Sequence, residues 1–385
     1  MLRMGMVGLG KMGLSHHAIV NAHPGVKVVA ACDKTAYLTD VLTKYTGLKC
    51  HEDYDRFLNE EQLDAVMIAT PSKMHASMVE KALNRGLHVF CEKPFVLDVA
   101  DGERLAALAE SKGLVNQVGY HYRFVGAFQE AARIVRSGAL GRIHHVRAEA
   151  YGPVVLRPKG GTWRSAKDEG GGALYDYACH ALDLVNFIAG APDTVSGVVL
   201  NSIYSRDVED EVYCSLHYAD GATGQLSVNW SDESYRKMST KISIWGTNGR
   251  INVDRQECQI YLRAASDALP EAKPGWTVKY TTELTQEVWF YMRGEEYSAQ
   301  IDYFVQAVAE KQANKQAQVQ VNNQVNNQVN SQAGNQAAHT NSFRSALEAD
   351  RLVSMILAEA GGSARPAPIG AAVDKPKGFW SRRFG

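Results

Sequence analysis

The chain has 385 residues, of which 45% are hydrophobic, so it is long enough to form two domains with substantial cores. Lys and Arg number 41 against 42 Asp and Glu, and this balance excludes a global electrostatic attraction to nucleic acid or to an anionic membrane. The six cysteines are scattered without a CxxC pair, which argues against a zinc site or a disulfide scaffold. Neither a secretion signal nor a run of ~18 apolar residues is found. We therefore expect a cytoplasmic protein that spans no membrane.

Residues 1–122 alternate short β-rich runs with helical stretches. The runs are rich in Val, Ile and Met, as buried parallel strands are, and read RMGMVG, VKVVAAC, LDAVMIAT, LHVFC and LVNQVG. Helical stretches separate them, including KMGLSHHAIVNA, SKMHASMVEKALNRG and VADGERLAALAESKG. Repetition of strand and helix in this way predicts a doubly wound parallel sheet, the Rossmann dinucleotide-binding fold.

After this region the pattern changes to alternating strands joined by tight turns. Residues 219–222 and 247–250 read ADGA and TNGR, and they contain the Asp-Gly and Asn-Gly pairs that hairpins prefer. Residues 123–311 are therefore predicted to form a second α/β domain with an open, largely antiparallel sheet. The fold class is α/β throughout.

The remaining segments differ in composition. Residues 312–338 repeat Gln, Asn and Val, and we expect a disordered insertion because so polar a segment cannot offset its chain entropy; a weak helical stripe of valines is the alternative. Residues 339–361 have the periodicity of an amphipathic helix that packs back on the core, and residues 362–385 form a flexible basic tail.

A glycine-rich loop opens the chain. Gly8, Gly10 and Gly13 have the GxGxxG spacing between a strand and a helix, where backbone amides and the helix N-terminus bind a pyrophosphate. Asp33 ends the next strand, where an acidic residue binds the ribose 2′-hydroxyl and favours NAD. Because Lys34 follows and could accommodate a 2′-phosphate, NADP remains an alternative cofactor. The loop residues expected to contact the dinucleotide are Gly8, Leu9, Gly10, Lys11, Met12 and Gly13.

Further polar residues follow the carboxyl ends of later strands, the edge at which doubly wound sheets bind ligands. On composition alone, the EKP sequence at 92–94 is more typical of an ordinary polar turn than of a site. The residues of this edge that we assign to the cofactor are Thr70, Pro71, His75, Glu92, Lys93 and Gln117.

The stretch GGGALYDYACHALDL at residues 170–184 is predicted to form a helix. With residues about 100° apart, Asp176, His180 and Asp183 fall on the side opposite the apolar stripe, so His180 is not a core histidine on an apolar face. Two interpretations stay open: a solvated polar face, or a site in which Asp176 and His180 hold one ligand. The spacing also suits metal ligands, but no further cluster supports a metal, and we expect none.

The order GLGKMG, TPSKMH, EKP and GGGxLxDxxxH resembles the glucose–fructose oxidoreductase/inositol dehydrogenase/rhizopine-catabolism (Gfo/Idh/MocA) family over residues 1 to about 310. This resemblance implies an NAD(P)-dependent dehydrogenase or reductase acting on a sugar, polyol or nucleotide sugar. It implies that Lys93, Asp176 and His180 are catalytic, with His180 as the acid/base. It also implies a dimer or tetramer formed through the C-terminal sheet.

Substrate contacts are expected from two segments near these residues. GYHYRF contributes Tyr120 and Arg123, and the loop before the helix contributes Trp163 and Arg164, beside Asp176 and His180 themselves. The cationic residues, with Arg157 and Lys159, would suit an anionic or nucleotide-linked sugar. Two alternatives remain: a non-catalytic NAD(P)-binding regulatory protein of the same fold, and an NAD-assisted hydrolase or lyase acting on glycosides.

Overall fold

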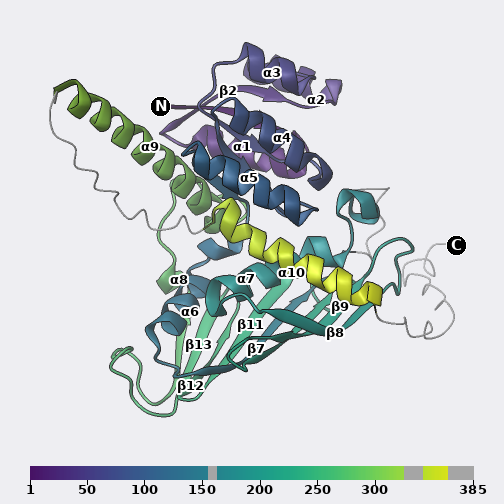
Figure 1. Ribbon diagram of the computed structural model, residues 1–385, viewed down its shortest axis with the longest axis vertical. Helices are drawn as coiled ribbons and strands as arrows, with labels where there is room; N and C mark the ends of the chain where they lie inside the picture. Colours follow the sequence, from purple (N-terminus) through teal and green to yellow (C-terminus); the bar gives the residue numbers. More distant parts are fainter. Residues whose placement is uncertain (155–162, 325–340, 363–385) are drawn as a thin grey trace, which may run out of the picture.

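The computed structural model describes residues 1–154, 163–324 and 341–362, with backbone alone over 315–324. Figure 1 shows a helix-covered Rossmann layer above a broad second sheet, with the yellow helix α10 (Phe343–Gly362) running along their junction. In the described part of the chain, no helix is long and apolar enough to cross a membrane.

The first sheet contains six parallel strands in the order β3-β2-β1-β4-β5-β6. The strands are β1 (Leu2–Val7), β2 (Val26–Cys32), β3 (Lys49–His51), β4 (Ala65–Ile68), β5 (His88–Cys91) and β6 (Asn116–Val118). Its helices are α1 (Lys11–Ala22), α2 (Ala36–Thr46), α3 (Tyr54–Glu60), α4 (His75–Asn84) and α5 (Val99–Ser111). Every residue of β4 and β5 is buried, as the apolar runs predicted. The Rossmann prediction is confirmed, although the short strand β3 was not predicted.

The second sheet contains eight strands in the order β14-β13-β12-β11-β7-β10-β9-β8. The strands are β7 (Ile143–Tyr151), β8 (Thr194–Asn201), β9 (Glu211–His217), β10 (Thr223–Asn229), β11 (Ser239–Gly246), β12 (Gly249–Val253), β13 (Glu257–Leu262) and β14 (Gly275–Tyr280). Its neighbouring strands are antiparallel apart from β7 and β10, which run parallel. The predicted open, largely antiparallel sheet is therefore confirmed.

One face of this second sheet is covered and the other is open. Helices α6 (Gly126–Ser137), α7 (Cys179–Ala189) and α10 pack on the covered face, where alternate strand residues such as Val146, Ala148 and Ala150 are buried. The open face carries polar side chains together with the exposed aromatic side chains of Trp276 and Tyr280. The strict alternation follows from the two-residue period of a strand.

The C-terminal helix α10 packs against both layers. Phe343 and Leu347 of α10 lie in the core of the Rossmann layer, whereas Val353 and Ile356 lie in the core of the second sheet. α10 therefore joins the two layers along its length.

Helix α9 (Glu295–Gln324) departs from the expected domain boundaries. Its apolar stripe, which includes Ile301 and Phe304, packs among Rossmann residues rather than with the second domain to which residues 123–311 were assigned. The helix also continues to Gln324, so the expectation of disorder is wrong for residues 312–324, where the chain extends an already formed helix. The rest of the predicted insertion and the basic tail lie outside the described residues.

Candidate active site

The glycine loop is closed on its inner side and open on its outer side. A Cβ atom at Gly13 would lie 1.8 Å from the Gly8 carbonyl oxygen, so the start of α1 packs directly against the loop. A Cβ atom at Gly10 would meet nothing within 4 Å. The first amides of α1 lack partners within the helix. This open cradle fits the pyrophosphate of a dinucleotide.

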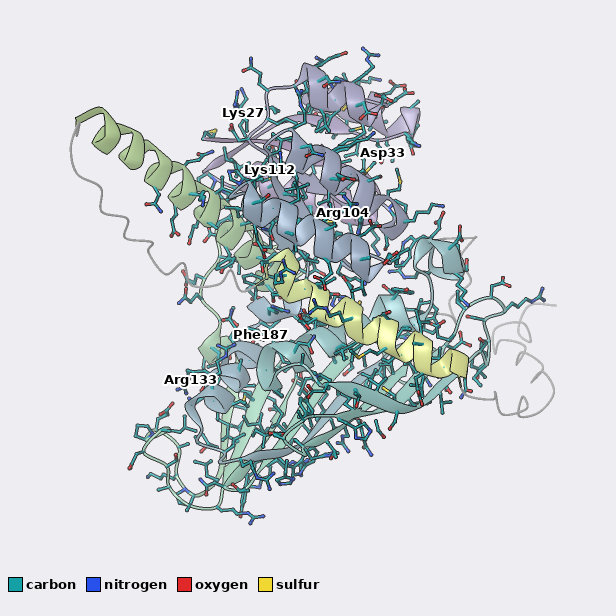
Figure 2. All side chains as sticks on the ribbon, in the orientation of Figure 1. Lys27, Asp33, Arg104, Lys112, Arg133 and Phe187 are labelled. Atoms are coloured by element: carbon teal, nitrogen blue, oxygen red, sulfur yellow. The ribbon has the colours of Figure 1, made fainter. Side chains whose placement is uncertain are left out.

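Asp33 lies at the carboxyl end of β2, and Figure 2 shows it on the opposite side of the Rossmann layer from Lys27. Its Oδ2 atom accepts a hydrogen bond from the Leu9 amide at 2.6 Å, and its Oδ1 atom accepts one from Thr35 at 2.8 Å. Each carboxylate oxygen has a further lone pair with which it can accept a ribose hydroxyl. Asp33 therefore braces the loop and fits the predicted sugar-binding role.

Two residues expected to contact the cofactor, His75 and Gln117, hydrogen-bond to the main chain of neighbouring segments. The buried ring of His75 places Nδ1 2.9 Å from the Pro94 carbonyl oxygen and Nε2 3.0 Å from that of Thr70, and burial lowers its pKa. Gln117 is buried, and its Nε2 atom donates to the carbonyl oxygen of Gln300 in α9. Both ring nitrogens of His75 thus face main-chain carbonyl oxygens, whereas the Oε1 atom of Gln117 is buried without a hydrogen-bond partner among the described residues.

Lys93 and Asp176 meet across the two domains. The Lys93 ammonium donates to Asp176 Oδ1 at 3.1 Å and to the Asp176 carbonyl oxygen at 3.0 Å. Arg164 Nε donates to the other carboxylate oxygen at 2.7 Å. Burial opposes ionisation of Asp176, yet the two cations hold its pKa below the usual value. Burial also disfavours the charge on Lys93, but the acidic groups of Cys179 and Asp176 keep its pKa above 10.5.

His180 lies beside this pair in an aromatic setting. Its ring is 5.2 Å from those of His121 and Tyr122 and 5.9 Å from that of Tyr120. Burial, reinforced by the Lys93 charge, lowers the pKa of His180 well below 6.5, so the imidazole is neutral at pH 7. Its Nδ1 atom is buried without a hydrogen-bond partner among the described residues. A neutral imidazole beside an ammonium group can take a proton from an alcohol.

The helix predicted over residues 170–184 does not begin as a regular α-helix. Leu174–Ala178 is a π-helical turn, and regular α-helix begins only at Cys179. The rotation of about 100° per residue does not hold through such a turn, because its hydrogen bonds join residues that are five apart in the chain. Asp176, His180 and Asp183 are all buried, so the solvated-face interpretation is wrong. The polar side packs against the first domain instead.

The glycines before this turn admit a neighbouring carboxylate. Glu209 Oε1 accepts a hydrogen bond from the Leu174 amide at 2.9 Å. Gly172 has a φ of 103°, and a Cβ atom there would lie 2.1 Å from the same oxygen. The glycine is needed both for its backbone conformation and for the approach of Glu209, which anchors the turn that carries Asp176.

The predicted substrate residues divide into two groups. Arg123 is buried and its guanidinium binds Asp183, with the closest contact at 2.5 Å, and Ser345; its expected role as a substrate contact is corrected to a structural one. Trp163 and Arg164 form the short helix η3 (Trp163–Ser165), where the guanidinium stacks 4.7 Å from the indole and reaches Asp176. Arg157 and Lys159 lie outside the described residues.

The structure also adds His16 and His121, which the sequence analysis did not single out. Glu92, expected to contact the cofactor, lies 2.6 Å from His16 Nε2. His121 of η2 (His121–Phe124) stacks on Tyr297 at 4.5 Å, and burial lowers its pKa to about 3. No local signal could have paired His16 with Glu92, because 76 residues separate them.

A cavity of about 430 Å³ adjoins this aromatic cluster. Arg255, which lines the cavity, places its guanidinium carbon 5.8 Å from the centre of the Tyr122 ring and binds Glu296 at 2.5 Å. Thr240 and Thr281 also line the cavity. Within the described ranges, no group of three His, Cys, Asp or Glu side chains could hold a metal ion.

The fold and the site together define a two-domain dinucleotide-binding protein with a Lys–Asp–His site between its domains. Comparison with models of known protein families identifies the family of both domains. Residues 2–120 match the oxidoreductase family with an NAD-binding Rossmann fold, and residues 128–252 match the GFO/IDH/MocA C-terminal domain. The chain belongs to the GFO/IDH/MocA oxidoreductase family, as its motifs predicted, and is an NAD-dependent oxidoreductase.

Individual relatives are distant. A 2,7-anhydro-N-acetylneuraminate hydratase of Mediterraneibacter gnavus is 25% identical over 66% of this chain and 67% of its own. The scyllo-inositol 2-dehydrogenase (NAD(+)) of Bacillus subtilis is 27% identical over 65% of this chain and 73% of its own. A structure of levoglucosan dehydrogenase in complex with NADH and levoglucosan, 22% identical, has a TM-score of 0.77 and covers 94% of this chain and 97% of its own. The last likeness bears on the fold alone.

Proposed function

We propose that the protein oxidises a secondary alcohol of an uncharged sugar or polyol, with NAD as the hydride acceptor. The observation that carries this proposal is the trio of Lys93, Asp176 and His180, with a charged lysine held against a carboxylate and a neutral histidine beside them. Two family relatives, a scyllo-inositol dehydrogenase and a levoglucosan dehydrogenase, act on such compounds by name.

Each residue of the trio has a distinct task. The bound nicotinamide supplies the acceptor for the hydride. The Lys93 ammonium stabilises the negative charge that develops on the substrate oxygen. The imidazole of His180 takes the hydroxyl proton, a contribution of ~10²–10⁴-fold for a positioned base. Asp176 holds Lys93 in place and is available to a second substrate hydroxyl through its carboxylate.

The charges around the site favour an uncharged substrate. Of the cations expected to bind an anionic sugar, Arg123 is paired with Asp183 and Arg164 with Asp176. The adjoining cavity, which none of Lys93, Asp176 and His180 lines, contains Lys237 and Arg255 together with Asp254, Glu295 and Glu296. The charges of these described residues do not sum to a net positive charge that would attract a nucleotide phosphate.

A panel of substrates tests the function. Purified protein with NAD is given anhydrosugars, free hexoses, inositols, a hexuronate and nucleotide sugars, and NADH formation is followed. We expect turnover with at least one uncharged compound. Turnover confined to the nucleotide sugars would overturn the substrate class, and no NADH formation with any compound would overturn the proposed reaction.

The cofactor choice rests on Asp33. A carboxylate at this position repels a 2′-phosphate, so we propose NAD as the preferred cofactor despite the neighbouring Lys34. The ratio of kcat/KM for NAD and NADP measures the preference, and Asp33→Ala is expected to reduce it at least tenfold. A ratio that does not change contradicts the assignment.

We further propose a homo-oligomer formed through the open face of the second sheet. Trp276 and Tyr280 of β14 and Tyr261 of β13 lie exposed on this face. An exposed apolar patch on a sheet is typical of an interaction surface. Light scattering should give a dimer or tetramer that Trp276→Glu dissociates, whereas a wild-type monomer would contradict the proposal.

A second candidate is hydration or elimination assisted by retained NAD, favoured by the relative named as a hydratase. The same trio can move protons while the cofactor returns to its starting state. Product formation without net release of NADH would identify this reaction.

A further inference from the structure

A buried pair of His16 and Glu92 lies next to the catalytic lysine. His16 Nε2 is 2.6 Å from Glu92 Oε1, and the two side chains are 0% and 11% exposed. The second carboxylate oxygen of Glu92 accepts a hydrogen bond from the amide of Lys93 at 3.1 Å. The pair therefore touches the main chain of Lys93 and not its ammonium.

The surrounding backbone fixes this arrangement. A Cβ atom at Gly119 would lie 2.9 Å from Glu92 Oε1, so the carboxylate fills the space that the glycine leaves. The Gly119 amide donates to the Cys91 carbonyl oxygen at 2.8 Å, which holds β5 and the chain after β6 together at that point. Glu92 is thus enclosed by the chain on one side and by His16 on the other.

The pair also links two functional segments. His16 lies in α1, whose first residue, Lys11, belongs to the glycine loop. The connection runs from the dinucleotide loop through α1 and His16 to Glu92, and from there to Lys93 and Asp176. Two hydrogen bonds therefore connect α1 to the main chain of Lys93.

The charged and titratable groups that face Lys93 come from several elements. Asp176 belongs to the π-helical turn, Cys179 and His180 to α7, and His121 to η2, while Arg164 of η3 acts through Asp176. Glu92 adds a negative charge that raises the pKa of Lys93. Burial opposes the ionisation of Glu92, but His16, Lys93 and His121 hold its pKa below the usual value, so the carboxylate is charged at neutral pH.

We propose that Glu92, oriented by His16, is a positioning residue that fixes the main chain of Lys93, adds a negative charge to its surroundings and connects it to the dinucleotide-binding helix. This replaces the expectation that Glu92 contacts the cofactor. The proposal rests on the proposed function for the role of Lys93, but its first test does not require turnover.

The first test measures the protonation of Lys93 directly. Competitive labelling with acetic anhydride across a pH series, read by mass spectrometry, gives the midpoint for the Lys93 amine. Glu92→Gln keeps the shape and removes the charge, and it should shift the midpoint to lower pH than in the wild type. Glu61→Gln is the matched control. Glu61 forms a similar pair, with its Oε1 atom 2.8 Å from His51 Nε2, and this pair lies outside the candidate site. A midpoint that is the same in both variants would overturn the proposal.

The second test separates positioning from cofactor contact. On the substrate that the wild type oxidises best, Glu92→Gln should lower kcat at least tenfold and change the Kd of NADH less than threefold. His16→Gln should lower kcat too, and the double variant should be no worse than Glu92→Gln, because both act through one contact. Additive losses in kcat, or NADH binding weakened tenfold, would overturn the proposal.

If Glu92→Gln does not fold, Glu92→Asp and His16→Gln provide the comparison. The labelling midpoint should stay near the wild-type value in Glu92→Asp, and a fall of one unit contradicts the proposal. A wild type without turnover counts against the proposed function alone, since the labelling result still decides this inference.

Discussion

Lys93 Nζ lies 3.1 Å from Asp176 Oδ1, although 83 residues separate the two in the chain. Lys93 follows a strand of the Rossmann sheet, whereas Asp176 lies in the π-helical turn of the second domain. Because both side chains are buried, the pair forms only when the two domains are packed together. The candidate site is thus a product of the domain interface.

Replacing Asp176 should weaken catalysis through the charge on Lys93. Asp176→Asn removes a carboxylate that raises the pKa of that amine, so the basic limb of the kcat profile should move to lower pH by about one to three units. We expect kcat/KM for the sugar to fall at least tenfold. Asp168→Asn is the control, since Asp168 is exposed and lies 3.9 Å from Lys73. A profile that Asp176→Asn leaves in place would refute the link.

The pH dependence of the wild type follows from the same groups. The pKa of His180 is well below 6.5, so its neutral, proton-accepting form persists as the pH falls through that value. The pKa of Lys93 is above 10.5, so its ammonium persists up to that pH. We expect kcat/KM to be nearly level between about pH 6.5 and 10. An acidic limb centred near pH 6.5 or above in the free enzyme argues against His180 as the base.

Two glycine substitutions separate cofactor binding from folding. Gly13→Ala places a methyl group against the Gly8 carbonyl oxygen and should lower the melting temperature markedly. Gly10→Ala meets no protein atom within 4 Å, so the melting temperature should hold while the Kd for NADH rises at least tenfold. Titration of NADH fluorescence and thermal unfolding measure both quantities. Unchanged affinity in Gly10→Ala would show that the loop does not hold the pyrophosphate.

Arg123 should matter for stability rather than for substrate binding. Arg123→Leu leaves the buried Asp183 carboxylate without its partner, which costs about 3–5 kcal/mol in the free energy of unfolding. The KM of the surviving folded protein should change little. Arg104, an exposed arginine labelled in Figure 2 that binds Asp101, is the matched control, and Arg104→Leu should leave the urea midpoint in place. A large rise in KM at normal stability would restore Arg123 to the substrate site.

The local patterns of the sequence were sufficient for the Rossmann sheet, whereas Lys93, Asp176 and His180 were singled out together only by the family resemblance. The glycine loop, Asp33 and Lys93 each follow a buried strand, and the carboxyl ends of parallel strands share one edge. Contacts between distant segments could not be predicted in this way. The pairing of Arg123 with Asp183 and of His16 with Glu92 depends on packing across 60 and 76 residues.

Backbone geometry set a second limit. The π-helical turn at Leu174–Ala178 changes the faces that a regular helix would present, so Asp176 and His180 were expected on a side opposite the core but are buried. The path of α9 was missed for a related reason. Its polar end continues a helix whose first half contains the buried residues Ile301 and Phe304, and composition alone does not reveal that continuation.

The central claim is that Lys93 and His180 carry out the proton and charge chemistry of alcohol oxidation. The most direct measurement is NADH formation by wild type, Lys93→Ala and His180→Ala on the same uncharged sugar or polyol, with NADH binding measured in parallel. The account predicts that each variant loses at least tenfold in kcat while its affinity for NADH is largely retained. Turnover near the wild-type rate in both variants would contradict it.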